Sequence, residues 1–417
     1  MIYVLSQGCA ANFGDGEKIA RILSQRHRVS FSYPDLAQIN SSSELEQQPE
    51  AFFLNVCTVK GNAGALKLLN KVHSDFPEAP IYITGCAPKD FKDAALQAVP
   101  AVKFSSLKEL ENHMAEAGAT TLRESPFVGI VNIEEGCLDA CAFCSTHLVK
   151  GRLHSFNEDF IVEQVNRLVS DGCAEIQLTG QDCACYGFDT GTNLAELVQK
   201  ILVKVPGKYK IRLGMGNPRH VLQYSEALLD CFSDDRIYKF IHLPVQSGSD
   251  NVLKAMGRRH SVDDYRVLAQ AFCERFDKFT LSTDLIVGFP GESETDYLET
   301  EALVRETRPS VCNITRYVAR PGTPAYSMPQ AVADSIKHER SARLAEVFQQ
   351  VALENNQKWI GCEETVVTEK TGYRAKTTIA RNAAYRPVAI AGTIPPGTEL
   401  QVKITGAEPF ALLAEPI

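Results

Sequence analysis

One stretch of sequence decides the fold: Gly136-Cys137-Leu138-Asp139-Ala140-Cys141-Ala142-Phe143-Cys144. The Cys-x3-Cys-x2-Cys spacing puts three thiolates on one loop, where they can ligate three irons of a four-iron cluster and leave the fourth iron open. A reactive metal site needs such an open position. A structural zinc site is the alternative, but such sites close all four positions, and no second Cys or Cys/His pair follows at finger spacing.

Predicted strands and helices alternate along the chain around this loop. The cysteine loop itself follows an apolar run at residues 128–134. Five more apolar runs, each followed by a helix-like segment, extend this alternation to about residue 355. They lie at residues 175–179, 210–215, 240–245, 280–289 and 311–318. Six consecutive βα units predict a parallel barrel or partial barrel, whose chemistry would lie at the carboxyl ends of its strands.

The first 118 or so residues are predicted to form a smaller parallel α/β domain. Its apolar strands at residues 2–5, 51–56 and 81–84 alternate with helix-like stretches at residues 15–25 and 64–76. A cysteine follows each strand: Cys9, Cys57 and Cys86. Because the carboxyl ends of parallel strands share one edge of a sheet, we expect these three thiols to converge.

The stretch from Trp359 onward is predicted to be a small all-β barrel, with β-type runs at residues 365–367, 377–379, 387–390 and 400–404. The segment 370–386 carries basic residues and no acidic one, interleaved with Tyr373 and Tyr385. The basic residues are Lys370, Arg374, Lys376, Arg381 and Arg386. Such a surface suits single-stranded RNA, because phosphates attract cations and unstacked bases need flat faces. A solvated strand face is the alternative.

The composition is that of a globular protein, with 44% hydrophobic and 23% charged residues among 417. A net charge of −8 excludes a histone-like protein, so a nucleic acid would have to meet a local basic patch. Thirteen cysteines favour cluster ligation over a disulfide framework, since the sequence predicts no secretory leader and no membrane span. We expect a cytoplasmic α/β protein with domains at residues 1–120, 125–356 and 357–417.

With Phe143 before its last cysteine, the cysteine loop resembles the signature of the radical S-adenosylmethionine (SAM) superfamily. The resemblance implies that SAM chelates the open iron through its amino and carboxylate groups. It also implies that one electron from the cluster cleaves SAM to a 5′-deoxyadenosyl radical. Because such a radical attacks almost any molecule, the barrel has to exclude water from it and orient it toward one atom of the substrate.

Three further motifs carry a narrower resemblance, to the methylthiotransferases. Residues 6–12, 55–60 and 84–87, each with one cysteine, resemble that family's amino-terminal domain, in which three cysteines hold a second four-iron cluster. Barrel segments resemble the family at residues 178–182, 212–218, 242–250, 283–292 and 320–324. The terminal barrel is similar to the family's RNA-binding TRAM domain, so the resemblance covers essentially the whole chain.

Within that family, residues 55–60, residues 212–218 and the Gly136-Cys137-Leu138 opening look most like the archaeal and eukaryotic branch. That branch acts on N6-threonylcarbamoyladenosine beside the tRNA anticodon. The implied reaction replaces the adenine C2 hydrogen with a methylthio group, using one SAM as methyl donor and a second as radical source. The implied partners are the tRNA anticodon stem-loop and a low-potential electron donor of the ferredoxin or flavodoxin type.

The resemblance also implies the cofactors, SAM and two [4Fe-4S] clusters, and their ligands. Cys137, Cys141 and Cys144 would hold the radical cluster. Cys9, Cys57 and Cys86 would hold the auxiliary cluster, which supplies or carries the sulfur to be transferred.

Weaker assignments concern the SAM pocket. Phe143 and the backbone of Thr179, Gly180 and Gln181 would contact SAM, although the latter three could form an ordinary βα turn. Arg212 would pair with the SAM carboxylate or neutralise another charge. His242 and Gln246 would line the pocket or pack in the core, and Asp284 would contact a ribose or the pocket wall.

One departure from the family is the pair Cys183 and Cys185, where non-thiol residues are more usual; we expect inert packing rather than sulfur handling. Three other functions stay open: methylthiolation of isopentenyladenosine in tRNA, methylthiolation of a ribosomal-protein aspartate, and non-catalytic RNA binding by an iron–sulfur protein. The basic segment 370–386 favours RNA over protein, and the intact cysteine loop argues against a non-catalytic role.

Overall fold

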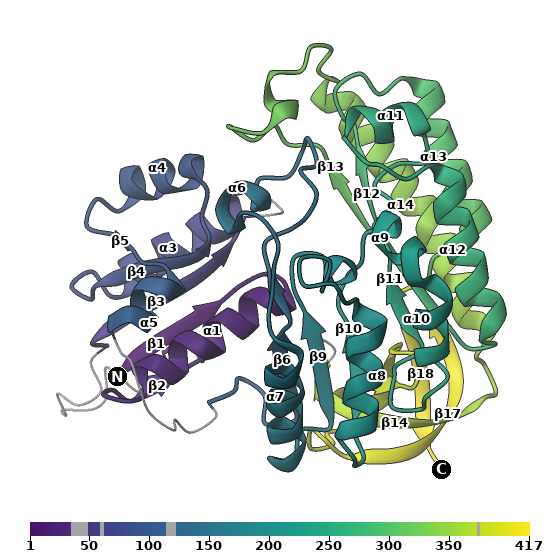
Figure 1. Cartoon of the computed structure of the whole chain (residues 1–417), viewed down its shortest axis with the longest axis horizontal. Helices are drawn as coiled ribbons and strands as arrows, with labels where there is room; N and C mark the ends of the chain where they lie inside the picture. The colour runs from purple at the N-terminus through teal and green to yellow at the C-terminus, as the bar shows by residue number, and fades with distance from the viewer. Residues whose placement is uncertain (35–48, 59–61, 114–121, 373–375) are drawn as a thin grey trace.

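The computed structural model describes residues 1–34, 49–58, 62–113, 122–372 and 376–417 and is drawn in Figure 1. Along the chain, a parallel sheet is followed by six strands with helices around them and then by a closed barrel. Within the described residues, no helix combines the length and apolar character needed to cross a bilayer.

The amino-terminal sheet is parallel throughout, with the strand order β2-β1-β3-β4-β5. Its strands are β1 (Ile2–Ser6), β2 (Val29–Ser30), β3 (Ala51–Cys57), β4 (Ile81–Cys86) and β5 (Lys103–Phe104). Its helices are α1 (Ala10–Leu23), α3 (Ala63–Asp75), α4 (Lys89–Ala98) and α5 (Leu107–His113). One apolar cluster joins the sheet to α3 and α4, and another joins it to α1 and α5. The predicted parallel α/β fold of this part is confirmed.

Six strands form the partial barrel in two parallel halves, β10-β9-β6 and β11-β12-β13. They are β6 (Val128–Asn132), β9 (Glu175–Thr179), β10 (Lys210–Leu213), β11 (Phe240–His242), β12 (Thr280–Val287) and β13 (Val311–Arg316). A parallel bridge between Ile211 and Ile237 links the halves. All six predicted strands are present. The second has the predicted bounds, and the other five end two or three residues early. The first does so because β7 (Glu134–Glu135) turns away to pair with β8 (His154–Ser155).

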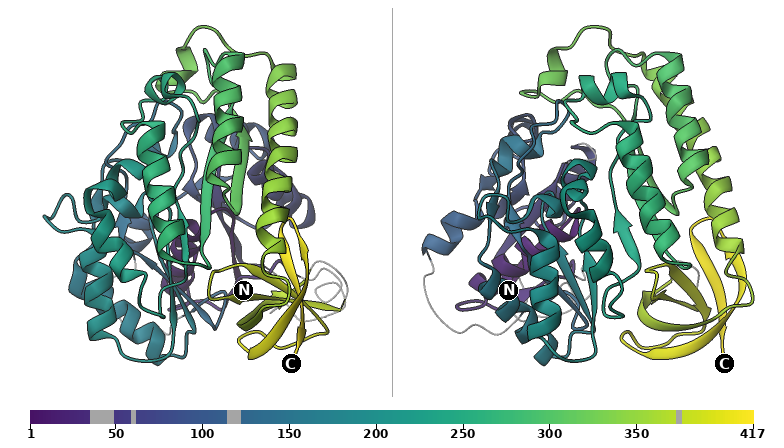
Figure 2. Two further views of the ribbon diagram at one scale, coloured as in Figure 1. Left: turned by 90° about the vertical axis from the view of Figure 1, so that its right-hand side faces the viewer. Right: turned by 45° about the vertical axis from the view of Figure 1, so that its right-hand side comes forward.

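Helices cover the outside of the partial barrel, as Figure 2 shows for the longest ones. The main helices are α7 (Glu158–Ser170), α8 (Leu194–Lys204), α10 (Ser225–Cys231), α12 (Val262–Arg275), α13 (Glu294–Thr307) and α14 (Asp334–Gln357). Shorter ones are α6 (Thr146–Lys150), α9 (Pro218–Val221), α11 (Asp250–Ala255), η2 (Cys183–Cys185), η3 (Leu222–Tyr224) and η4 (Pro324–Ser327). Ser261 and Ser293 start α12 and α13 with capping boxes, which satisfy the first free backbone donors.

The carboxyl-terminal part is a closed barrel with the strand order β14-β15-β16-β18-β17, so the predicted β-barrel is confirmed. Its strands are β14 (Glu363–Thr371), β15 (Thr377–Asn382), β16 (Pro387–Ala391), β17 (Glu399–Glu408) and β18 (Ala411–Pro416). The sequence analysis missed β18. This strand closes the barrel by pairing parallel to β16 and antiparallel to β17.

This closed barrel packs against the amino-terminal ends of the partial-barrel strands. Tyr385 Oη donates to Glu175 Oε1 (3.1 Å) at the start of β9. Arg386 donates to Ser310 Oγ (2.6 Å) just before β13, and its guanidinium carbon lies 5.5 Å from the centre of the Trp359 ring. Tyr385 and Arg386 therefore help to close the floor of the partial barrel, opposite the ends of the strands where chemistry is expected.

Candidate active site

The three amino-terminal cysteines lie at one edge of their sheet. Cys57 and Cys86 end β3 and β4 in register, and Cys9 directly precedes α1. Gly8 has to be glycine, because its φ is +115° and a Cβ there would lie 2.2 Å from the Cys57 Cβ. Burial raises the pKa of the Cys86 thiol to about 12, and the neighbouring thiols of Cys57 and Cys9 add to the rise. The structure therefore brings the three predicted auxiliary ligands together as free thiols.

The second cysteine triplet lies on the loop between β7 and α6, at the mouth of the partial barrel. Asp139 anchors this loop to α9: its carboxylate accepts from Asn217 Nδ2 (2.7 Å), contacts His220 Nε2 (3.0 Å) and pairs with Arg219. Although burial raises it, His220 and Arg219 hold the pKa of Asp139 below its usual value. The sequence analysis missed this anchor, although its position between two cysteines could have drawn attention to it.

Further contacts clamp the middle of the cysteine loop. Ala142 N donates to Met256 O (2.8 Å), and Ala142 O accepts from Ala325 N (2.9 Å). Arg258 donates to Cys141 Sγ at 3.6 Å. Burial raises the pKa of the Cys141 thiol to about 11, and Arg258 opposes that rise. A cation beside the thiol favours the thiolate form that binds iron, so the loop fits a cluster.

Thr179, Gly180 and Gln181 follow β9 next to the cysteine loop. Gln181 Oε1 accepts from Gly136 N (2.7 Å), which ties the two segments together. A Cβ at Gly180 would lie 1.9 Å from Glu134 Oε1, so a larger residue there would displace that carboxylate. The segment 179–181 therefore packs against the cysteine loop at the mouth of the partial barrel.

Glu134 is a buried carboxylate that the sequence analysis treated only as the end of a strand. Its Oε1 accepts from Asp182 N (3.0 Å), and its Oε2 has no hydrogen-bond partner among the described residues. Burial raises the pKa of Glu134 to about 8. Buried acceptors are normally paired, so the free oxygen suits a donor on a bound molecule.

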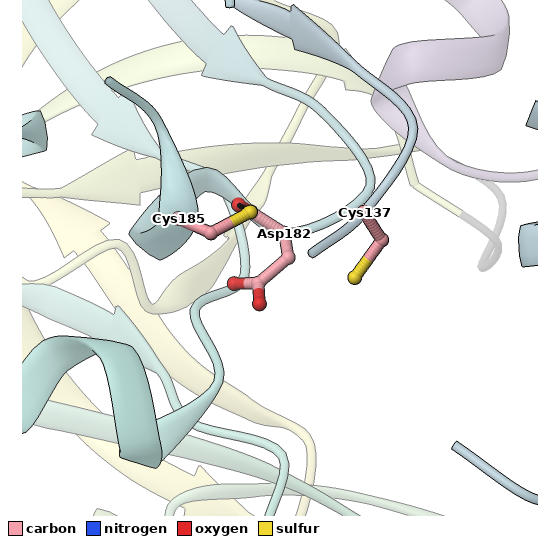
Figure 3. A group of neighbouring side chains, drawn as sticks. All are labelled: Cys137, Asp182 and Cys185. Atoms are coloured by element: carbon pink, nitrogen blue, oxygen red, sulfur yellow. Dashed lines mark hydrogen bonds between the residues drawn. The ribbon is translucent and has the colours of Figure 1, made fainter. Parts of the chain in front are cut away.

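Cys137 has two further neighbours, Asp182 and Cys185, which Figure 3 shows together. One ligand atom of each lies within 4.8 Å of those of the other two. Cys185 is fully buried, and its thiol donates to Asp182 O (3.1 Å). Cys183 is enclosed by the core, where a Cβ at Gly214 would lie 2.4 Å from its sulfur. Inert packing stays the prediction for both thiols, although Cys185 stands beside a predicted cluster ligand.

His242 and Asp284 meet on the wall of the partial barrel. His242 Nε2 contacts Asp284 Oδ1 (2.9 Å), and Asn313 Nδ2 donates to the same oxygen (2.7 Å). Gln246 is buried with a φ of +80° and bridges to Leu285 of β12. The structure therefore joins three predicted pocket residues to β12 and adds Asn313, which sequence reasoning did not identify.

Arg212 lies at the floor of the partial barrel. Its guanidinium carbon is 5.3 Å from the centre of the Phe240 ring and 5.8 Å from that of Tyr385, the residue that reaches in from the closed barrel. Its Nε is buried without a hydrogen-bond partner among the described residues. These neighbours connect Arg212 with the domain contact; its contact with the SAM carboxylate stays a prediction.

Phe143 lines a cavity of about 450 Å³ beside the cysteine loop. The other walls come from Ile286 of β12, from Asn313 and Thr315 of β13, and from Tyr317 just after β13. The volume is in the range of small-molecule sites. Phe143 is the residue predicted to contact SAM among the described residues that line it, so this cavity is a candidate small-molecule pocket.

The five basic residues predicted to bind RNA lie in different environments. Lys370 and Lys376 are exposed at the end of β14 and just before β15. Arg381 donates to Glu369 Oε2 (3.0 Å), an acid one residue outside the segment 370–386. Arg386 is buried in the floor contact described above, which is a correction to its placement on an RNA-facing surface. Arg374 lies outside the described residues.

Asp15 of α1 joins the two cysteine-bearing edges. Its carboxylate accepts from Asn132 Nδ2 of β6 (2.8 Å) and pairs with Lys150 Nζ of α6 (2.9 Å). Lys150 also pairs with Glu135 (3.0 Å), and its charge acts to lower the pKa of Cys86 against the effect of burial. The helix that follows Cys9 is thus attached to the strand and helix on either side of the radical loop.

Replacing Lys150 should loosen this contact. Lys150→Met leaves the Asp15 carboxylate, 9% exposed, without its ammonium partner, and we expect about 3 kcal/mol less unfolding free energy. Chemical denaturation of the apoprotein measures the loss. The double variant Lys150→Met/Asp15→Asn should recover most of it, because the unpaired charge is gone; equal loss in both variants would contradict the assignment.

Comparisons with known proteins identify the family of this chain. The family model described as the Radical SAM superfamily matches residues 131–304. The chain is 42% identical over 283 residues to a probable threonylcarbamoyladenosine tRNA methylthiotransferase of Archaeoglobus fulgidus, covering 68% of this chain and 66% of that protein. A protein of the same name from Pyrococcus horikoshii is 34% identical, with 89% of each chain covered.

Among solved structures, the radical SAM methyltransferase TsrM from Kitasatospora setae has a TM-score of 0.54 at 12% identity, covering 78% of this chain and 76% of that one. That likeness supports the fold. The sequence relatives carry the narrower assignment. The chain belongs to the threonylcarbamoyladenosine tRNA methylthiotransferase family within the radical SAM superfamily.

Proposed function

We propose that this chain is an enzyme that installs a methylthio group at C2 of N6-threonylcarbamoyladenosine in tRNA, next to the anticodon. The names of its relatives support the substrate, and the radical SAM match supports the chemistry. The structural observation that carries the proposal is the Asp15 junction, which attaches the helix after Cys9 to both sides of the radical cysteine loop. A sulfur-donating site and a radical-generating site have to be neighbours for this reaction.

The cofactors follow from the family. SAM and a [4Fe-4S] cluster on Cys137, Cys141 and Cys144 supply, when bound, a carbon radical able to attack an aromatic C–H that has no acidic proton. The chain's own task is to hold the loop rigidly through Asp139 and Ala142 and to keep the pocket dry. We assign a second four-iron cluster to Cys9, Cys57 and Cys86, because three free thiols converge there.

The wider setting of the enzyme is also part of the proposal. The tRNA anticodon stem-loop would meet the TRAM-like barrel at residues 357–417, and a ferredoxin or flavodoxin would supply low-potential electrons. The domains at residues 1–120 and 125–356 would hold the two clusters. A cytoplasmic location would fit a tRNA substrate and is part of the proposal.

One assay tests the function directly. The reconstituted protein is incubated anaerobically with SAM, a low-potential reductant and tRNA that carries either threonylcarbamoyladenosine or isopentenyladenosine, and the nucleosides are analysed by mass spectrometry. We expect a methylthio product only on the threonylcarbamoyl substrate. Deoxyadenosine without a modified nucleoside would retain the radical chemistry and reject the substrate.

The exposed lysines of the closed barrel predict a separable effect on RNA affinity. Lys370→Ala/Lys376→Ala should weaken binding of the anticodon stem-loop and lower the slope of log K against log salt by about 2, one for each lost phosphate contact. Lys403→Ala, another exposed lysine on β17, is the matched control and should bind normally. Fluorescence anisotropy at several salt concentrations measures both quantities. An unchanged slope in the double variant would remove these lysines from the RNA surface.

A further inference from the structure

The cavity beside the cysteine loop is electropositive. It is bounded by Phe143 and by β13, the edge strand of its half-barrel, which is green in Figure 1. Two of the described residues that line it are arginines, Arg316 and Arg320, and none is a carboxylate. In a chain with a net charge of −8, this local excess of positive charge favours an anionic ligand.

Tyr317 lies between the two arginines in the sequence and is a second polar residue of this wall. Its side chain is 8% exposed and lines the cavity, but its hydroxyl has no hydrogen-bond partner among the described residues. Buried hydroxyl groups are nearly always paired. The Tyr317 hydroxyl therefore suits an acceptor atom on a molecule bound in the cavity.

Arg316 is the accessible cation of this wall. It is exposed, and its Nη1 contacts His338 Nδ1 only at 3.5 Å, the long limit of a hydrogen bond. That contact uses one of five guanidinium donors. The acid Asp334, whose pKa is lowered chiefly by Lys337 and to a smaller extent by Arg316, is paired with Lys337 (2.9 Å). The guanidinium fork thus has the donors needed to bind a carboxylate in bidentate fashion.

The substrate of the proposed function, on which this inference rests, has one anionic group that isopentenyladenosine lacks. This group is the carboxylate of its threonyl moiety, which is ionised at neutral pH. We propose that Arg316, assisted by the Tyr317 hydroxyl, binds the threonyl carboxylate in this cavity and so determines substrate specificity. Phe143 in the cavity wall would then place the attached adenine beside the radical loop.

SAM and RNA also carry anionic groups, so the test has to isolate the threonyl carboxylate. We compare two anticodon stem-loops that differ only in this group, one with threonylcarbamoyladenosine and one with its neutral threoninamide analogue. The phosphates and the SAM are identical in both. Two measurements are made with the reconstituted enzyme: kcat/KM for methylthio product, and the Kd for each RNA without reductant.

We expect wild-type enzyme to favour the carboxylate RNA by about tenfold or more in both measurements, the size of one charge-assisted hydrogen bond. Arg316→Gln should reduce that ratio to near one, and Arg316→Lys should restore part of it. Tyr317→Phe should lower the ratio a few-fold. Arg275→Gln, which alters an exposed arginine on α12 outside the cavity, is the matched control and should keep the wild-type ratio.

The outcomes also separate this inference from the proposed function. If wild-type enzyme forms no methylthio product on the threonylcarbamoyl RNA, the proposed function fails. If it forms product but Arg316→Gln keeps the wild-type preference for the carboxylate, only the role of Arg316 fails. A raised KM for SAM with an unchanged RNA ratio would assign Arg316 to the SAM carboxylate and overturn the inference.

Discussion

The triple variant Cys137→Ala/Cys141→Ala/Cys144→Ala should lose about half of its iron and sulfide and all cleavage of SAM. The three cysteines lie on one loop that contacts at Asp139 and Ala142 hold against the barrel, and the triple variant leaves no thiol on that loop. Without the open iron there is no place for SAM to accept an electron. Anaerobic iron and sulfide analysis and chromatography of deoxyadenosine measure both losses.

A matched control separates ligand loss from a general effect of removing thiols. Cys273→Ala/Cys362→Ala changes two cysteines outside both triplets and should retain full iron and full SAM cleavage. Near-complete iron loss in the triple variant would point to global misfolding, which the far-ultraviolet circular dichroism spectrum would report. Unchanged iron would show that the ligands have been assigned wrongly.

Local patterns in the sequence were enough to predict the six strands of the partial barrel and the position of the cysteine loop. The six barrel strands are short apolar runs at regular spacing, and the Cys-x3-Cys-x2-Cys spacing lies within nine residues of chain. The convergence of Cys9, Cys57 and Cys86 was also predictable, because parallel strands end at one edge of a sheet.

The partners that hold the site came from distant parts of the chain and left no local pattern. Asp139 meets His220 across 81 positions, and Lys150 meets Asp15 across 135. The burial of Arg386 could not be predicted from the sequence for the same reason. Its charge suggested an RNA surface, but Ser310, 76 positions away, binds it inside a domain contact.

The solvent exposure of individual side chains also could not be predicted from the sequence. The sequence predicted Glu134 only as the last residue of a strand. In the structure its side chain is 1% exposed next to Gly180, and burial raises the pKa of its carboxyl group. The strand β18 was missed because Ala411–Pro416 contains no β-branched or aromatic residue that would favour a strand, and only barrel closure pairs it on both sides. Both features depend on tertiary packing.

The second large effect is expected at the amino-terminal site. Cys9→Ala/Cys57→Ala/Cys86→Ala should also lose about half of the iron, but it should still cleave SAM to deoxyadenosine while forming no methylthio nucleoside. The reason is the separation of the two sites: Cys9, Cys57 and Cys86 belong to the amino-terminal sheet, whereas the radical loop and its anchors belong to the barrel. Loss of sulfur transfer should therefore leave radical generation intact.

This variant distinguishes two roles for the amino-terminal triplet. If the triplet carries the transferred sulfur, product is absent at any concentration of SAM, because the substrate radical meets no sulfur donor. If the triplet only stabilises the contact at Asp15, product falls together with SAM cleavage, and Lys150→Met should reproduce the defect with the auxiliary iron retained. Product formation and deoxyadenosine formation, measured in the same reaction, decide between the two, since only a sulfur-carrying role predicts that they separate.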